Sequence, residues 1–277
     1  MQDQYVQVDE VKTRYWKLGG QGTALILLHG LGGHVELWHD NIVALGQYHQ
    51  VYAVDMVGCG YSDKPEISYS LDSLAQFIKD FMNVLGIERA SLIGCSMGGG
   101  VALQFALMFP EKLEKLVLIS SIGLGTGTTP LFRLIALPFV GEFLTRLTGK
   151  LGITWLFKQV VYDPILITEK MVQDSYQISV KPGFRRAYLA LIRTNAQYFG
   201  VSSQDSNPIL DKLGTITTPT FVIWGQQDST IPVAHAYIAA NNLLNNRLHI
   251  FPYCKHWPAR EHLKDFNALV LDFLSID

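Results

Sequence analysis

This sequence contains few cysteines, little excess of either charge and only short apolar runs. The three cysteines (Cys59, Cys95 and Cys254) are few and far apart, which argues against a disulfide framework and favours a reducing compartment. Lys and Arg total 22 against 24 Asp and Glu, and these charges form no long run. This balance implies neither nucleic acid nor an anionic membrane as a partner.

The apolar runs are too short to span a bilayer, and the run at residues 131–140 contains Arg133 and Pro138. Residues 1–4 lack the basic and apolar regions of a signal peptide. We therefore expect a cytoplasmic protein without a membrane span. Internal repeats and low-complexity tracts are also absent from the sequence.

What is present describes an ordered α/β protein. Of the 277 residues, 48% are hydrophobic and 17% are charged, which allows a substantial core. Short apolar runs predict strands at residues 24–28, 51–54, 90–93, 116–119, 220–224 and 248–251. Helical spacing predicts helices at residues 71–85 (with Asp72 near the N-cap), 101–108, 232–243 and 265–274. This alternation is typical of a doubly wound, mostly parallel sheet.

Residues 123–207 break the alternation. They contain no convincing strand, are rich in Leu, Phe and Ile, and are mostly helical in pattern between several prolines. We interpret them as a helical cap inserted into a core formed by residues 1–122 and 208–277. Extra packing of the core is the alternative interpretation.

The most specific motif is Gly94-Cys95-Ser96-Met97-Gly98, which lies between a predicted strand and a predicted helix. A Gly-x-Ser-x-Gly turn in this context forces the serine into a strained conformation that exposes its hydroxyl. Ser96 is therefore the predicted nucleophile. A glycine-rich turn that merely contains a serine is the alternative.

A serine hydroxyl needs a base to take its proton and an acid to orient that base. Asp228 is the predicted acid, because it follows the strand at 220–224, where ligand sites of such sheets collect. An ordinary turn aspartate is the alternative. Asp55 precedes Ser96 in a glycine-containing turn and Asp205 lies in the expected cap, so both are weaker candidates.

His256 is the predicted base. It follows the last predicted strand, and the resulting order Ser, Asp, His is the one expected for a triad on an open α/β sheet. The other histidines lack this position; among them, His249 lies inside a strand run and His262 begins a helical pattern.

The loop His29-Gly30-Leu31-Gly32-Gly33 follows the first core strand. Glycines allow close approach of backbone N–H groups to a developing oxyanion, so we assign the two donors to Leu31 and Met97. Gly30 and Gly32 are expected to contact the substrate, and His29 to support the loop.

Two other site types are disfavoured. His29, His34 and His39 recur every five residues, off helical register, and no Cys or carboxylate cluster joins them as metal ligands. Gly58-Cys59-Gly60 lacks the third glycine of a dinucleotide fingerprint, because Asp63 stands there. We therefore expect no metal and no cofactor.

Together, the His29–Gly33 loop, the Asp55–Ser62 segment, the Ser96 elbow, Asp228 and His256 resemble the α/β-hydrolase superfamily over nearly the whole chain. Within it, the sequence looks most like the meta-cleavage-product hydrolases, which split a carbon–carbon bond in ring-fission products. The segments that carry this likeness are Ser96–Gly99 with Ala102–Leu107, Ser121–Gly125, and His256–Pro258 with Glu261, His262, Phe266 and Asn267. The resemblance implies that Trp257 lines the site beside His256.

The sequence also departs from that family. Cys95 stands where the family usually has asparagine, and the loop after His29-Gly30 lacks the usual proline. The cap arginine that grips the substrate's charged end should fall near Ser175, and Arg185, Arg186 and Arg193 do not fill its place. The absence of this polar anchor counts against a charged dienone substrate.

Three functions follow as hypotheses. The first is a serine hydrolase acting on a small-molecule carboxylic ester through an acyl-enzyme on Ser96. Large apolar residues of the cap suggest a hydrophobic acyl or aryl group: Leu131, Phe132, Leu134, Phe139, Phe143, Trp155 and Phe157. The second is carbon–carbon bond hydrolysis of a dienone acid by the same triad. The third is a non-catalytic ligand receptor on the same scaffold. Whether the chain forms a homo-oligomer stays open.

Overall fold

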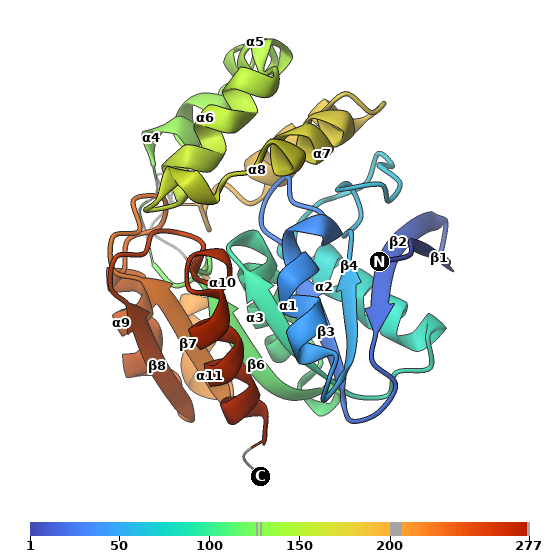
Figure 1. Ribbon diagram of the computed structural model, residues 1–277, viewed down its shortest axis with the longest axis vertical. Coiled ribbons are helices and arrows are strands. Elements are labelled where there is room, and N and C mark those ends of the chain that lie inside the picture. The colour runs from blue at the N-terminus through green and yellow to red at the C-terminus, as the bar shows by residue number, and fades with distance from the viewer. Residues whose placement is uncertain (126, 128, 200–206, 276–277) are drawn as a thin grey trace.

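The computed structural model describes residues 1–125, 127, 129–199 and 207–275, and these form an eight-stranded sheet (Figure 1). In the order β1-β2-β4-β3-β5-β6-β7-β8, every pair from β4 to β8 is parallel, whereas β1 and β2 form an antiparallel hairpin at one edge. The strands are β1 (Gln4–Val8), β2 (Val11–Leu18), β3 (Ala24–Leu28), β4 (Gln50–Val54), β5 (Ala90–Cys95), β6 (Leu113–Ile119), β7 (Thr220–Gly225) and β8 (Asn246–Phe251).

Helices connect the parallel strands. Those of the sheet layer are α1 (His39–Leu45), α2 (Leu71–Val84), α3 (Met97–Met108), α9 (Ala234–Asn242), α10 (Pro258–Glu261) and α11 (Leu263–Ser275). Those between β6 and β7 are α4 (Pro130–Ala136), α5 (Val140–Leu147), α6 (Lys150–Val160), α7 (Glu169–Ser179) and α8 (Phe184–Thr194). Short 3-10 helices are η1 (Val35–Trp38), η2 (Pro110–Lys112), η3 (Pro164–Leu166) and η4 (Leu210–Thr215).

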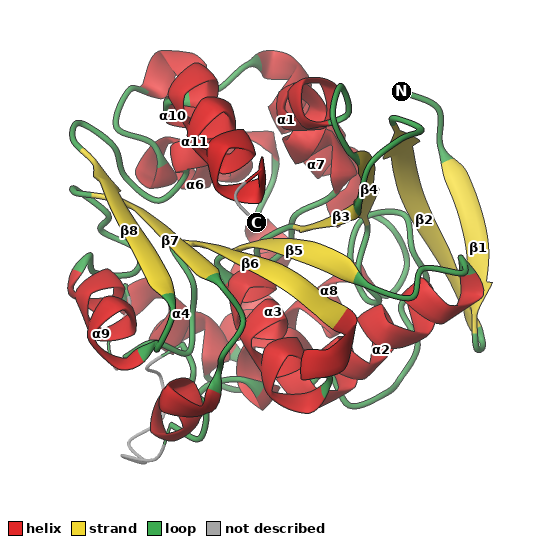
Figure 2. Cartoon of the chain, turned by 90° about the horizontal axis from the view of Figure 1, so that it is seen from below, coloured by secondary structure: helices red, strands yellow, loops and turns green. Residues whose placement is uncertain are grey.

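Both faces of the central sheet are buried, which explains why its strands read as continuous apolar runs. Alternate residues of β3 show this: Leu25 and Leu27 pack with α1 and α11, and Ile26 and Leu28 pack with α2 and α3. Figure 2 shows the two layers, with α1 and α11 on one side of the sheet and α2, α3 and α9 on the other. The predicted α/β class and mostly parallel sheet are confirmed.

Every predicted strand and helix of the core is present, with ends that differ by a few residues. The prediction missed the hairpin β1–β2 and the helices α1 and α10. Asp72 is not the cap of α2, because the Ser70 side chain caps it and accepts a hydrogen bond from the Ser73 N–H. Serine at an N-cap satisfies one of the amide groups that a helix start leaves unpaired.

Helices α4 to α8 form a helical insert that lies beyond the carboxyl ends of the strands, at the top of Figure 1. Its described residues contain no strand, in agreement with the sequence pattern. Within the described chain, no helix combines the length and apolar character needed to cross a bilayer.

Candidate active site

The carboxyl ends of the parallel strands bring distant segments to one edge of the sheet. β3 and β5 are neighbours, although β4 lies between them in the chain and pairs on the far side of β3. Such a reversal of strand order opens a crevice where ligands of α/β proteins bind. The His29–Gly33 loop follows β3 and Ser96 follows β5, so both lie at this point.

Ser96 occupies a strained turn between β5 and α3. Its φ of 55° and ψ of −114° lie where non-glycine residues are uncommon. The turn is held by a bond from the Ser96 N–H to the Ile119 carbonyl (2.8 Å) and by the Ser96 carbonyl, which accepts from Gly99 and Ile122. This is the strand–turn–helix geometry expected of a nucleophile elbow.

The two glycines of the motif are required by backbone contacts. A Cβ at Gly94 would lie 2.3 Å from the Gly98 carbonyl oxygen, and a Cβ at Gly98 would lie 2.3 Å from the Leu28 carbonyl oxygen. Both distances are far below contact, so any side chain would push α3 away from the sheet. The two glycines therefore set the position of Ser96 relative to the sheet.

Asp228 and His256 are directly hydrogen-bonded. Nδ1 of His256 lies 2.8 Å from Oδ2 of Asp228, and both side chains are buried. The second oxygen of Asp228 accepts from the Thr230 and Ile231 N–H groups at 2.8 and 3.0 Å. With both oxygens engaged, the carboxylate is fixed in place, and it fixes the imidazole in turn.

The backbone of the His256 loop is held by Glu261 of α10. One oxygen of Glu261 accepts from the N–H groups of Lys255 and Trp257, on either side of His256, at 2.9 and 3.3 Å. The other oxygen accepts from the Tyr162 N–H of the helical insert. The His256 N–H donates to the Val160 carbonyl (3.0 Å), which is a second tie to the insert. In the sequence Glu261 belongs only to the family likeness, and no local pattern predicts this contact.

The His29–Gly33 loop lies directly beside Ser96. A Cβ at Gly30 would lie 3.2 Å from the Ser96 Cβ, and the Gly33 N–H closes the loop onto the Gly30 carbonyl at 3.0 Å. Gly32 has a φ of 67°, and its Cα faces the ring of Tyr188 from α8. His29 braces the loop internally: Nδ1 lies 2.8 Å from the Gly30 carbonyl, and Nε2 accepts from the Met56 N–H. Burial lowers the pKa of His29, which favours the neutral ring that this contact needs.

The predicted oxyanion donors occupy suitable backbone positions. Met97 is the first residue of α3, and the first N–H groups of a helix have no partner within the helix. They also lie at the positive end of the helix dipole. Leu31 is the central residue of the loop beside Ser96, and its side chain packs against a buried apolar cluster of the insert, formed by Ile135, Leu189 and Ile192.

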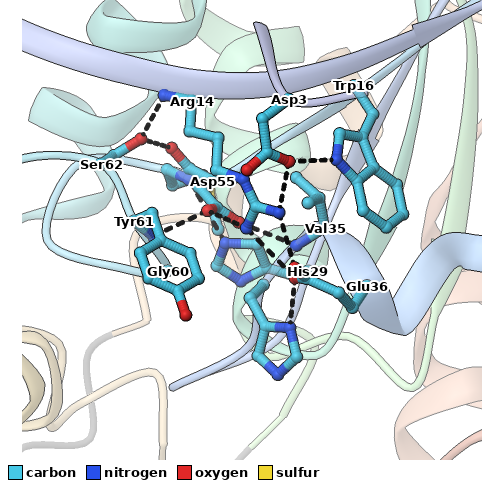
Figure 3. A network of polar contacts seen from close by, with 12 residues as sticks. Asp3, Arg14, Trp16, His29, Val35, Glu36, Asp55, Gly60, Tyr61 and Ser62 are labelled. Carbon is cyan, nitrogen blue, oxygen red and sulfur yellow. Dashed lines mark hydrogen bonds and ion pairs between the residues drawn. The ribbon is translucent and has the colours of Figure 1, made fainter. Parts of the chain in front are cut away.

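A partly buried ion network lies next to the same loop (Figure 3). Arg14 of β2 binds Glu36 (2.6 Å), Asp3 (2.6 Å) and Asp55 (3.2 Å). Asp55 also accepts from the Val35 N–H at 2.7 Å, and this bond fixes the chain just after the loop. The prediction that Asp55 forms a turn is consistent with its bond to the Tyr61 N–H (2.8 Å).

The charges of this network stabilise one another. Burial opposes the charge of Arg14, but its bonds to the three carboxylates outweigh burial and raise the pKa of the guanidinium. Burial likewise raises the pKa of Glu36, but hydrogen bonds from His34 and Arg14 prevail and lower this pKa to about 2. The network was not predicted, because its members are distant in the chain and Arg14 belongs to a hairpin that was not predicted either.

Ser175, where the resemblance would place a substrate-binding arginine, is bonded to His34. Its Oγ lies 2.8 Å from Nε2 of His34, whose Nδ1 lies 2.7 Å from Glu36. Two nearby arginines are occupied elsewhere, since Arg186 binds Glu66 and Arg193 binds Glu142. This corner of the site therefore holds Glu36, whose charge is already paired with Arg14 of β2.

Trp257 is buried beside His256, and its ring stacks on Phe157 of the insert with centroids 6.1 Å apart. Cys95 is buried as well, and burial together with the nearby Asp228 carboxylate raises the pKa of its thiol to about 12. Four of the seven apolar cap residues that suggested a hydrophobic substrate group are exposed to solvent instead: Leu134, Phe139, Phe143 and Trp155. The suggestion was wrong for these four, because the sequence could not tell the outer faces of the insert from the inner ones.

Of the other candidates, His249 lies within β8, and the ring of His262 stacks on Phe251. Asp205 lies outside the described residues. Within the described chain, no group of three or more His, Cys, Asp or Glu side chains is placed to hold a metal ion.

Comparison with known proteins agrees with this fold. The alpha/beta hydrolase fold family matches residues 23–263. The 2-hydroxy-6-oxononadienedioate/2-hydroxy-6-oxononatrienedioate hydrolase of Comamonas testosteroni is 34% identical over 266 residues, which cover 92% of this chain and 89% of that protein.

Two solved structures extend the comparison. A meta-cleavage product hydrolase from Pseudomonas fluorescens IP01 is 28% identical, with a TM-score of 0.84 over 98% of this chain and 97% of the other. A membrane phospholipase A, described as a bacterial virulence factor, is 25% identical, with a TM-score of 0.76 over 99% and 85%. The chain belongs to the α/β-hydrolase fold family, and its relatives include meta-cleavage product hydrolases and other serine hydrolases.

Proposed function

We propose that this α/β hydrolase cleaves a carboxylic ester with an apolar acyl or aryl group through an acyl-enzyme on Ser96. The observation that carries the proposal is the buried bond between His256 and Asp228 at the sheet edge where the Ser96 elbow ends β5. In this proposal, residues 123–207 act as a cap over the site, and Trp257, Gly30 and Gly32 contact the substrate.

The proposed reaction proceeds in two halves. His256 takes the proton of Ser96 through Nε2 while the serine Oγ attacks the acyl carbonyl, and the N–H groups of Leu31 and Met97 bind the oxyanion. The C–O bond then breaks, and His256 returns the proton to the departing alcohol. Water, deprotonated by His256, attacks the acyl-enzyme and releases the acid and free Ser96. Asp228 keeps Nδ1 protonated throughout.

The surroundings of Ser175 favour an uncharged substrate. His34 links Ser175 to Glu36, and the Glu36 carboxylate is already paired with Arg14. A substrate carboxylate at this place would have to compete with Glu36 for that arginine, which disfavours binding of a charged substrate. Carbon–carbon hydrolysis of a dienone acid is the second candidate, favoured by the named activity of the Comamonas testosteroni relative.

The test is a panel of chromogenic esters of increasing acyl length, run beside a yellow ring-fission dienone acid, with wild type and Ser96→Ala. We expect ester turnover that Ser96→Ala lowers by about 10⁴-fold or more, since removal of a triad nucleophile costs this much elsewhere. If the dienone acid has the higher kcat/KM, the second candidate replaces the first. Ester turnover that is unchanged in Ser96→Ala would remove Ser96 as nucleophile.

A fluorophosphonate probe tests the third possibility, a ligand receptor on the same scaffold. Such a probe reacts with an activated serine and needs no knowledge of the substrate. We expect Ser96 to be labelled in the folded protein and labelling to disappear in Ser96→Ala. Folded protein that stays unlabelled would favour a receptor.

A further inference from the structure

The outer helices of the insert expose large apolar side chains to solvent. α5 and α6 lie beyond the carboxyl ends of the strands, at the top of Figure 1. The residues that we call the outer apolar surface are Phe139 (87% exposed), Phe143 (62%), Leu147 (65%), Leu151 (88%) and Trp155 (53%). Scattered exposed apolar residues are ordinary, but a concentration of large ones marks a site of interaction.

The spacing of these residues places them along helix faces. Phe143 and Leu147 lie four residues apart on α5, and Leu151 and Trp155 lie four residues apart on α6, so each pair shares one face of its helix. Phe139 directly precedes α5. The inward sides of the same helices are occupied by other residues, since Gly141 of α5 and Ile153 of α6 are buried. The outer apolar surface is therefore additional to the faces that pack the insert on itself.

Positive charge accompanies this surface. Residues 130–160 contain four Lys or Arg and one Asp or Glu, although acids outnumber bases in the chain as a whole. The one acid, Glu142, is bonded to Arg193. Arg146 and Lys158 are exposed, and neither has an ion-pair partner among the described residues. The balanced charge of the whole sequence concealed this local excess.

We propose that the outer apolar surface docks on an anionic lipid bilayer, with its side chains at the acyl boundary and Arg146 and Lys158 at the headgroups. Aromatic and aliphatic residues beside unpaired cations are the signature of helices that lie in a membrane interface. A second copy of this chain is a poorer occupant, because it would bring the same positive charge to the contact. Binding of this kind goes beyond the proposed reaction, since it requires no turnover.

Trp155 provides a direct readout of docking. The other four tryptophans, at positions 16, 38, 224 and 257, are buried, so a change of emission on adding vesicles reports on Trp155. The experiment mixes the full chain at low salt with phosphatidylcholine vesicles and with vesicles that also contain phosphatidylglycerol. We expect a blue shift, and quenching by brominated lipid, with at least about tenfold tighter binding to the anionic vesicles.

Variants separate the two contributions in a vesicle co-sedimentation assay. Phe143→Ser with Leu151→Ser should weaken binding at least about tenfold, because two large side chains lose their burial. Arg146→Glu and Lys158→Glu should each weaken binding at least about fivefold. Leu244→Ser is the matched control, since Leu244 is 69% exposed but lies outside the insert, between α9 and β8. Trp155→Phe should lose the fluorescence signal and keep most of the binding.

Thermal melting of each variant shows whether it is folded, independently of any activity. The proposal fails if folded wild type does not bind anionic vesicles at low salt, or if it binds neutral vesicles equally well. It also fails if sedimentation velocity finds a dimer that Phe143→Ser dissociates, since the surface would then be a subunit contact.

Discussion

The sheet edge and the helical insert use their side chains in opposite ways. At the edge, Ser96, Asp228 and His256 are buried, and each is fixed by hydrogen bonds from the backbone or from a neighbouring side chain. On the outer helices of the insert, large apolar side chains are more than half exposed to solvent. Rigid surroundings suit chemistry, which needs groups held in a reactive geometry, whereas an exposed apolar surface suits recognition.

Polar contacts join the two regions at the site. Val160 and Tyr162 bind the His256 loop, directly and through Glu261, and Ser175 binds His34. Val160 and Tyr162 lie beside the proposed base, and Ser175 lies beside the proposed oxyanion loop. The insert therefore contacts the two segments whose positions matter most for the proposed reaction.

The largest expected effect lies at the sheet edge. Asp228→Asn keeps an oxygen for the Thr230 and Ile231 N–H groups but presents an NH₂ group to Nδ1 of His256. The imidazole then carries its proton on Nε2 and cannot accept one from Ser96. We expect kcat/KM for an ester to fall by roughly 10⁴-fold with little loss of stability. Activity within tenfold of wild type, measured on folded protein, would show that Asp228 does not orient the base.

An intermediate effect is expected where the two regions meet. Glu261→Ala frees the backbone on both sides of His256, and kcat should fall by roughly tenfold to a hundredfold with a smaller change in KM. Glu261→Gln keeps an acceptor for Lys255 and Trp257 and should recover most of kcat. Steady-state kinetics measure the split, with the exposed Glu88→Ala as control. Equal loss in the Gln and Ala variants would contradict a positioning role.

The smallest effect on activity, but a measurable one on stability, is expected next to the oxyanion loop. The pKa of Glu36 is about 2 in the folded protein against an ordinary value of 4.5. Its contribution is therefore present above pH 4.5 and is lost as the pH falls toward 2. Glu36→Gln should lower the free energy of unfolding by up to roughly 3 kcal/mol at pH 7 and by much less near pH 2.

Urea unfolding of both proteins at several pH values measures this difference. Glu66→Gln is the control, because Glu66 forms an exposed ion pair with Arg186 and should change stability by less than about 1 kcal/mol. A Glu36→Gln deficit that is the same at every pH would mean that packing, and not charge, is the origin of the effect.

The sequence was sufficient for the parts of the fold that depend on local pattern. Apolar runs predicted the parallel strands, and the glycine spacing around Ser96 predicted the turn, because both follow from short-range sterics and burial. Position after a strand selected Asp228 and His256, which are bonded to each other in the structure. The helical character of the insert was also predicted from spacing.

What could not be predicted depends on partners far apart in the chain. Arg14 joins Asp3, Glu36 and Asp55 only once the hairpin β1–β2 has paired with β4. Alternation of apolar residues at Val6, Val8 and Val11 was the available signal for that hairpin. The same limit explains the misplaced lining residues, since Phe139 and Phe157 look alike in sequence, yet one faces solvent and the other stacks on Trp257.

The turn at Ser96 has a consequence for which residues position 96 can hold. A positive φ is tolerated by a small unbranched side chain, but a branched Cβ would meet the adjacent backbone. Threonine, although chemically the closest alcohol, therefore suits this corner less well than cysteine does. The backbone conformation, more than chemical reactivity, therefore limits which nucleophilic residues can occupy position 96.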